Sequence, residues 1–293
     1  MELTKNFVKA KRPCADGLRW YLRHRQRPAA STDYQALLDA LVREGRIADA
    51  CWLLDQFGPT DAELALEHLE AEALVFAGSL RVRGAVRIEG LLRCGRQIEA
   101  GAGLAVGGDL IAGDQLRSGG AIRCGGRLEA GDDIRADWGI EVGAALSGGG
   151  GLRAAWDLEV GAGLRLAGAL RIGRALRVAG ALDCAKGLWA GGAVETGADL
   201  HAAQGIKAGT GLRCGGHLQA GWGIRAGGAI RAAGAIKAGE SLLAGGPLEA
   251  GPGYGIYAGL DVRAEAWPSS ARVRAAARPA ALLSGCWAEE DEP

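Results

Sequence analysis

The sequence is poor in the large side chains from which most soluble proteins build a core. Aromatic residues make up 5% of its 293 residues, and there is a single methionine. A conventional core of interlocking large side chains is therefore not expected. No stretch approaches the ~18 uncharged apolar residues of a transmembrane helix. Acidic and basic residues are equal in number, 34 each, so net charge favours neither nucleic acid nor an anionic membrane as a partner.

Motifs that carry chemistry are also missing. The seven cysteines are odd in number and have no CxxC spacing, which is typical of reduced thiols in a cytoplasmic protein. The opening residues MELTKNFVKAKRP are basic but hold no apolar segment, so we expect no secretory signal. There is no GxxxxGK[ST], GxSxG or HExxH motif. We predict a protein without catalytic residues, cofactor or metal.

Glycine, by contrast, is abundant, and it is part of a regular repeat. Fifty residues are glycine and only eight are proline, without the Gly-X-Y period of collagen. Stepping by six from Leu74 to Leu260 meets Leu, Ile or Val at every position except Tyr254. A small residue usually stands two positions after each aliphatic residue, a charged or polar one stands between them, and glycine often follows.

This period predicts a mainly β protein, a single-stranded parallel β-helix. Side chains alternate faces along a strand, so the aliphatic and small residues point inward and the charged residue points outward. Glycine then permits a corner. Three six-residue sides give a three-sided solenoid of about ten coils of 18 residues. We expect a helical cap over residues 1–73, the β-helix over 74–264, and a C-terminal cap with an acidic tail over 265–293.

Residues before the repeat have helical patterns. Helices are predicted near 17–25, over 32–45 and over 46–58, with Thr32 and Gln35 as a capping box for the second. Another short helix is predicted from Thr60, because Glu63 follows it by three residues and leucines follow at helical spacing. The helical domain is expected to dock on the first coil, either as a cap for the open sheet edge or as a partner-binding module.

The outer columns of the solenoid hold the candidate binding residues, because residues 18 apart stack in such a coil. One column carries Arg117, Arg135, Arg153, Arg171 and Trp189 in succession. Stacked arginines repel by roughly 1 kcal/mol per neighbour in water, and we expect Asp133 in an adjacent column to offset part of this repulsion. The next side of the solenoid mixes arginine and glutamate.

Tryptophans are expected to border this basic side. Trp138 and Trp156 are 18 apart and share one edge, whereas Trp222 lies at the other edge. Arginine and tryptophan on a flat surface are typical of a binding patch. The alternative is a solvated face whose tryptophans shield the coil corners.

Two histidines, His201 and His217, are candidate catalytic residues. His201 and His217 lie on the same side of neighbouring coils, and His217 is expected above Asp199, 18 residues earlier. Such a pair could act as a general base or bind a metal, as in a hexapeptide-repeat transferase working at an oligomer interface. A solvent-facing ladder is the favoured interpretation.

The stretch LQAGWGIRAGGAIRAAGAIKAGESLLAGG resembles the β-helical repeats of bactofilins and related FapA-like, polymer-forming bacterial proteins, over roughly residues 74–264. The resemblance implies a non-enzymatic cytoplasmic scaffold that assembles through its ends, often near the membrane. The array here is longer, and both ends carry additional sequence, which argues against filaments.

We therefore expect a non-enzymatic β-solenoid scaffold or interaction protein. Its partner would be an acidic protein or a second copy of the chain. Nucleic acid is a less favoured partner, and peripheral membrane association is left open. The alternatives are the transferase described above and a toxin-neutralising or effector-type partner protein.

Overall fold

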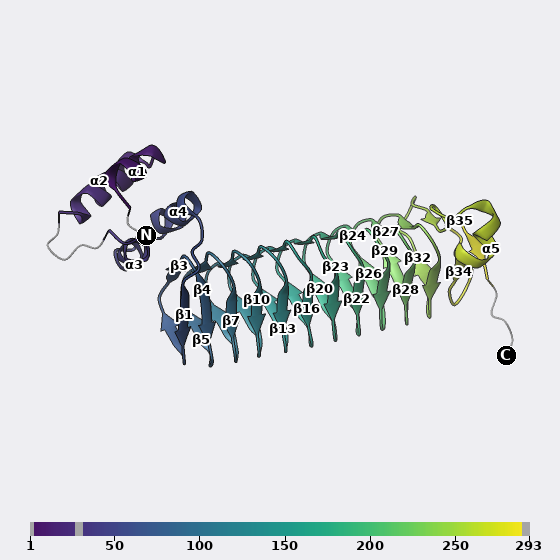
Figure 1. Ribbon diagram of the computed structural model, residues 1–293. Coiled ribbons are helices and arrows are strands. Elements are labelled where there is room, and N and C mark those ends of the chain that lie inside the picture. The colour runs from purple at the N-terminus through teal and green to yellow at the C-terminus, as the bar shows by residue number, and fades with distance from the viewer. Residues whose placement is uncertain (1–2, 27–31, 289–293) are drawn as a thin grey trace.

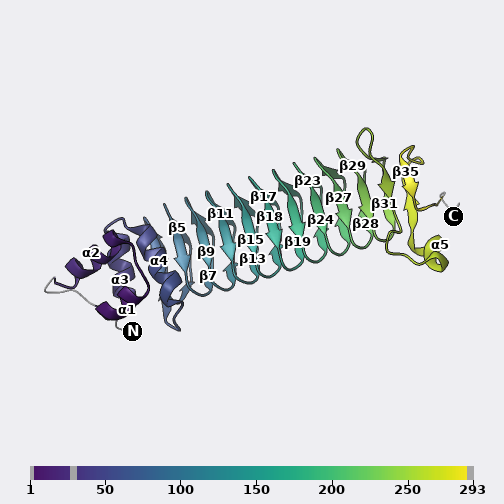
Figure 2. The same ribbon diagram turned by 90° about the horizontal axis from the view of Figure 1, so that it is seen from above.

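The chain forms a straight β-solenoid with a helical region at its N-terminal end and an irregular C-terminal end (Figures 1 and 2). The computed structural model describes residues 3–26 and 32–288. Three parallel sheets of 13, 11 and 12 strands form the three sides, which gives about twelve turns and a rod roughly 55 Å long. The prediction of a three-sided parallel β-helix with a helical N-terminal region is confirmed, although the turns exceed the expected ten. Within the described residues, no helix is long and apolar enough to span a membrane.

Each sheet takes every third strand of the chain as far as β34, and β35 and β36 then extend sheets 3 and 1. Sheet 1 contains β1 (Glu63–Leu66), β4 (Ser79–Val82), β7 (Ile98–Ala100), β10 (Leu116–Ser118), β13 (Ile134–Ala136), β16 (Leu152–Ala154), β19 (Leu170–Ile172), β22 (Leu188–Ala190), β25 (Ile206–Ala208), β28 (Ile224–Ala226), β31 (Leu242–Ala244), β34 (Arg272–Arg274) and β36 (Cys286–Trp287). Sheet 2 contains β2 (Leu69–Ala71), β5 (Val86–Ile88), β8 (Leu104–Val106), β11 (Ile122–Cys124), β14 (Ile140–Val142), β17 (Leu158–Val160), β20 (Leu176–Val178), β23 (Val194–Thr196), β26 (Leu212–Cys214), β29 (Ile230–Ala232) and β32 (Leu248–Glu249). Sheet 3 contains β3 (Leu74–Phe76), β6 (Leu92–Cys94), β9 (Leu110–Ala112), β12 (Leu128–Ala130), β15 (Leu146–Gly148), β18 (Leu164–Leu166), β21 (Leu182–Cys184), β24 (Leu200–Ala202), β27 (Leu218–Ala220), β30 (Ile236–Ala238), β33 (Ile256–Tyr257) and β35 (Leu282–Ser284).

The interior is filled by the aliphatic positions and their small partners. Leu116 of β10 pairs with Ile134 of β13, 18 residues later, and both are buried. Arg117 between the inward positions is exposed, as strand alternation requires. Gly131 follows β12 where neighbouring coils approach closely, because a Cβ there would lie 1.9 Å from the carbonyl oxygen of Gly113. Close approach, and not a left-handed backbone, is what selects glycine at this corner.

Polar side chains at several corners bond to the next coil. The Asp109 carboxylate accepts the backbone N–H of Arg127 at 2.8 Å, and that of Asp133 accepts the N–H of Gly151 at 2.6 Å. In each case the acceptor stands 18 residues before the donor. These side chains supply partners for corner N–H groups that the strand ladders leave unpaired. Asp133 is therefore tied to the backbone of the next coil.

The solenoid begins earlier than expected. The short helix predicted from Thr60 is wrong, because these residues form β1 and β2, with Leu64 opposite Leu80 and Leu69 opposite Val86. Their aliphatic residues are spaced by five along the chain, so a search at period six misses them. The first strand is thus at Glu63, ahead of the expected limit at 74.

The C-terminal end departs from the period as well. Ile256, and not Tyr254, pairs with Ile236 and is buried, whereas Leu260, predicted to face inward, is 53% exposed. A turn at Pro252–Gly253, with Gly253 at φ 78°, inserts two residues. Strand pairing then continues past the expected limit at 264 to β36, interrupted by a 3-10 turn (Ala264–Ala266) and α5 (Trp267–Ser270). The acidic tail lies outside the described residues.

The helical region contains α1 (Lys5–Ala10), α2 (Ala15–His24), α3 (Tyr34–Arg43) and α4 (Ile47–Phe57). Three of these correspond to the predicted helices, but the cap of α3 is Asp33 and not Thr32. The Gln35 side chain instead donates to the carbonyl oxygen of Val75 at 3.1 Å and accepts the N–H of Ala77 at 2.9 Å. Val75 and Ala77 also join the core of the helices. The helical region therefore docks on the first complete coil, as predicted.

Candidate partner-binding face

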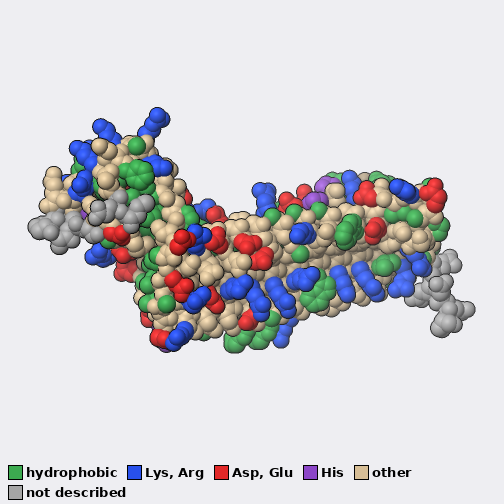
Figure 3. All heavy atoms as spheres, in the orientation of Figure 1, with side chains coloured by type: hydrophobic (Ala, Val, Ile, Leu, Met, Phe, Trp, Pro, Cys, Tyr) green, Lys and Arg blue, Asp and Glu red, His purple; other side chains and the backbone are tan. Residues whose placement is uncertain are grey.

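The predicted column of basic residues runs along the outside of sheet 1. The pairing of the strands places Arg117 opposite Arg135, then Arg153 and Arg171, and Arg171 opposite Trp189. The column continues with Lys207 and Arg225. A row of Lys and Arg side chains is visible along this side of the rod, with hydrophobic side chains beside it (Figure 3). We call these seven residues, Arg117 to Arg225 at intervals of 18, the basic face.

The positive charge of the basic face is largely unpaired. Arg135 forms a salt bridge with Asp137 at 3.2 Å, so the compensating carboxylate is Asp137 and not the expected Asp133. Over residues 32–288 the remaining cations have no salt bridge, namely Arg117, Arg153, Arg171, Lys207 and Arg225. Their side chains are exposed, so water and dissolved ions screen the repulsion between their charges.

The other two sheets show the opposite arrangement. On sheet 2, Arg177 bridges Glu159 at 2.9 Å and Glu195 at 3.6 Å, one on each neighbouring coil. On sheet 3, Asp183 contacts both Arg165 and His201. The same 18-residue geometry thus places opposite charges next to one another on two sides of the rod. Within residues 32–288, only sheet 1 stacks four like charges in succession, because the like-charged runs on sheet 2, Glu141–Glu159 and Arg213–Arg231, are two residues long.

Tryptophans border the basic face as predicted. Trp138 and Trp156 lie at the corner between sheets 1 and 2, where their rings stack with centroids 5.2 Å apart and planes 7° apart. The guanidinium of Arg174 lies 4.8 Å from the Trp156 ring centroid, which adds a cation–π contact. The sequence analysis missed Arg174, although a further step of 18 from Trp156 reaches it.

At the opposite edge, Trp222 stands at the corner between β27 and β28. A shallow groove of about 380 Å³ lies between it and Trp189, with Arg171 and Lys207 at its sides. Trp189 is 42% exposed and Trp222 52%. All eight predicted contact residues therefore lie on sheet 1 or at its two edges.

The histidines do not form a shared site. Nδ1 of His201 lies 2.9 Å from the Asp183 carboxylate on the outside of sheet 3. His217 does stand above Asp199, but it is its backbone N–H that donates to the Asp199 carboxylate, at 2.7 Å. The ring Nδ1 of His217 accepts the N–H of Ala235 at 3.0 Å. His217 thus acts in the same way as the corner aspartates.

The buried cysteines fill small inward positions. The Cys124 thiol donates to the carbonyl oxygens of Gly108 and Arg127, and burial raises the pKa of Cys124 to about 11. Burial also raises the pKa of Cys184. In the part of the chain that the structure describes, no three His, Cys, Asp or Glu side chains gather as a metal site would require.

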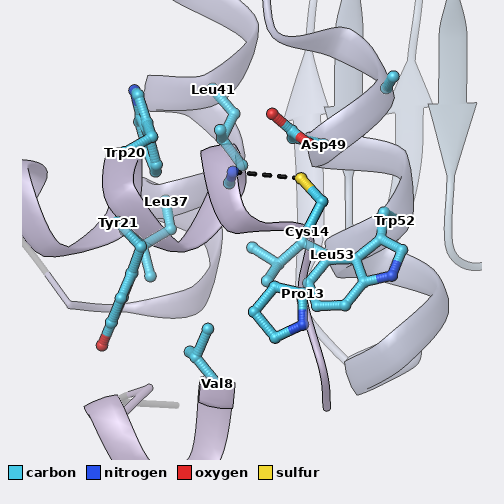
Figure 4. A pocket seen from close by; sticks show the side chains of 12 residues that line it. Val8, Pro13, Cys14, Trp20, Tyr21, Leu37, Leu41, Asp49, Trp52 and Leu53 are labelled. Carbon is cyan, nitrogen blue, oxygen red and sulfur yellow. Dashed lines mark hydrogen bonds between the residues drawn. The ribbon is translucent and has the colours of Figure 1, made fainter.

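A separate apolar cavity of about 230 Å³ lies among the four N-terminal helices (Figure 4). Trp20 and Tyr21 of α2 face Trp52 of α4 across it, and the Cys14 thiol at its rim accepts the N–H of Gly17 at 3.2 Å. The sequence pattern does not indicate this cavity, because its lining comes from four segments that are separate along the chain.

Comparison with known proteins separates the two parts of the chain. Residues 1–57 match the family model of the YdhT N-terminal domain. The match ends where α4 ends, at Phe57, and covers the helical region without the solenoid. No curated protein matches the chain. No solved structure matches it either.

Proposed function

We propose that this chain is a non-enzymatic β-solenoid scaffold that binds an acidic protein partner through the basic face. The observation that carries the proposal is the contrast between the three sides of one regular rod. Sheets 2 and 3 mix arginines with carboxylates and have no like-charged run longer than two, whereas sheet 1 stacks four arginines in succession and, within residues 32–288, leaves three of them without a salt bridge.

Stacking like charges destabilises the rod, so the arrangement is explained by what it can bind. A partner that brings carboxylates to the basic face would replace several repulsions by attractions and release bound counterions. Trp189 within the face and the tryptophans at its edges add large exposed surfaces of the kind enriched at interfaces.

The test is capture of a partner from the native host, with variants matched in charge. Arg135→Glu/Arg153→Glu reverses two neighbouring charges on the basic face, and Arg213→Glu/Arg231→Glu makes the same change on sheet 2, away from the basic face. We expect the first variant to lose partners that wild-type protein and the second variant retain, while both variants still unfold cooperatively. Equal capture by all three proteins would contradict the proposal.

Self-association through the ends, as in the bactofilins that the repeats resemble, is a second form of the scaffold proposal. At the N-terminal end the helical region covers β3, because Gln35 of α3 hydrogen-bonds to the backbone of Val75 and Ala77. This contact favours a rod that does not polymerise at that end. Light scattering over a range of concentrations tests this form. A transferase acting through His201 receives less support, because its Asp183 contact lies on an exposed outer wall beside Arg165.

A further inference from the structure

An open groove lies beside Trp138, at the corner where the basic face meets sheet 2. It has a volume of about 660 Å³ and runs from β2 to Trp138, across five successive coils. Its floor consists mainly of glycine and alanine, including Ala102 and Gly120. These two residues occupy the positions 36 and 18 before Trp138, so the tryptophan column continues into a stretch with almost no side chains.

Trp138 closes one end of this groove with an aromatic surface. Trp156 covers one face of its ring. The opposite face points along the rod toward the coil of Gly120, which has no side chain to cover it. Trp138 accordingly remains 53% exposed. An additional planar group of similar size could lie on this face at stacking distance and extend the series Arg174, Trp156, Trp138 by one member.

Positive charge stands on both sides of the same corner. Arg87 and Arg123 line the groove from sheet 2. Arg123 lies 3.7 Å from Glu141, whereas Arg87 has no salt bridge within residues 32–288. Arg117 begins the basic face on the sheet 1 side, three residues before Gly120. A chain that crosses the corner thus meets arginine before and after the aromatic surface.

From this arrangement we propose that the partner of the basic face is recognised through an acidic segment carrying one aromatic residue, whose ring stacks on Trp138. Carboxylates on either side of the ring pair with Arg87 and Arg117. This inference rests on the proposed function and specifies the chemistry of the partner.

A single-stranded nucleic acid could also offer rings and negative charge, but the groove favours a peptide. Glu70 lines its far end and Glu141 borders Arg123, so a continuous phosphate backbone would meet carboxylates as well as arginines. A peptide can place a neutral ring there and direct its separate carboxylates to the arginines. The balanced total charge of the chain likewise gives no general attraction for a polyphosphate.

The inference is tested with two synthetic peptides and fluorescence anisotropy. Both are fluorescein-labelled and rich in Asp and Glu; one carries a central Trp and the other an Ala in its place. We expect the Trp peptide to bind wild-type protein about five-fold more tightly, as one aromatic pair provides. In Trp138→Ala this preference should disappear, while Trp222→Ala, the matched loss of an exposed tryptophan at the other edge, should keep it.

The outcomes separate the two proposals. Equal affinity of both peptides for the wild-type protein, together with loss of binding in Arg135→Glu/Arg153→Glu, would overturn the aromatic recognition and leave the basic face standing. Failure of both peptides to bind would contradict both proposals. Tighter binding of an oligothymidylate strand than of the Trp peptide would overturn the inference in favour of nucleic acid.

Discussion

Reversing one charge in the basic face should stabilise the protein, which is unusual for a substitution that adds no contact in the core. Arg153 stands between Arg135 and Arg171 on neighbouring strands. Glutamate at this position would turn two repulsions into two attractions. The matched substitution is Arg177→Glu on sheet 2, where the flanking residues are Glu159 and Glu195. There the same change breaks two salt bridges and creates two repulsions.

The size of the effect follows from the coil spacing of ~4.8 Å. Two unit charges at about 5 Å interact by about 0.8 kcal/mol in water, and physiological salt roughly halves this value. Losing two repulsions and gaining two attractions changes the free energy of unfolding by four times the screened value, or about 1.6 kcal/mol. The mobility of exposed side chains reduces this to about 1 kcal/mol. Arg153→Glu should gain this amount, and Arg177→Glu should lose a similar amount.

Urea unfolding followed by circular dichroism measures the effect without screening the charges. We expect the midpoint to rise for Arg153→Glu and to fall for Arg177→Glu. Both shifts should shrink to about a third in ~1 M NaCl, where the Debye length is about 3 Å. Shifts of the same sign for both variants, or shifts that salt leaves unchanged, would refute the electrostatic argument on which the proposed function depends.

Two further predictions concern the register and the corners. Ile256→Ala should cost about 2–5 kcal/mol of unfolding free energy, whereas Leu260→Ala should change it by less than about 0.5 kcal/mol, because Ile256 is buried and Leu260 is exposed. Equal losses in urea unfolding would show that the register does not shift before Ile256. The N–H and guanidinium of Arg127 hold the pKa of Asp109 below its ordinary value. The contribution of the Asp109 carboxylate to the stability of the fold is therefore complete above about pH 4 and is lost as the pH falls toward the lowered pKa. Asp109→Asn should therefore be less stable than wild type at pH 7 and should lose less stability on acidification to pH ~3, and parallel losses in the two proteins would contradict this assignment.

The middle of the rod and its basic face could be predicted from the sequence because a constant period fixes every position in the turn. Once the coil is 18 residues, Arg135 must lie between Arg117 and Arg153 whatever rotamers they adopt. The ends could not be predicted in this way. Leucines spaced by five and the insertion before Ile256 break the period, and Thr60 with Glu63 imitates a helix cap.

The parts of the site that depend on side-chain rotamers also lay beyond the sequence. Asp133 and Asp137 are equally close to Arg135 along the chain, but Asp133 is drawn to a backbone N–H of the next coil and Asp137 takes the salt bridge. One face of the Trp138 ring is free because Gly120, on the preceding coil, has no side chain to cover it. In the sequence pattern this glycine looks like any other corner residue.

The unbroken 18-residue register from Leu92 to Leu248 makes the length of the rod proportional to its number of coils. Every complete coil adds ~4.8 Å between the helical region and the C-terminal strands without rotating one side of the rod into another. Adding or removing whole coils would change the separation of whatever is attached to the two ends while leaving each wall facing its original direction. Removing six residues, which is one side of a coil, would keep the aliphatic residues inside but would turn every later wall to the neighbouring side of the rod.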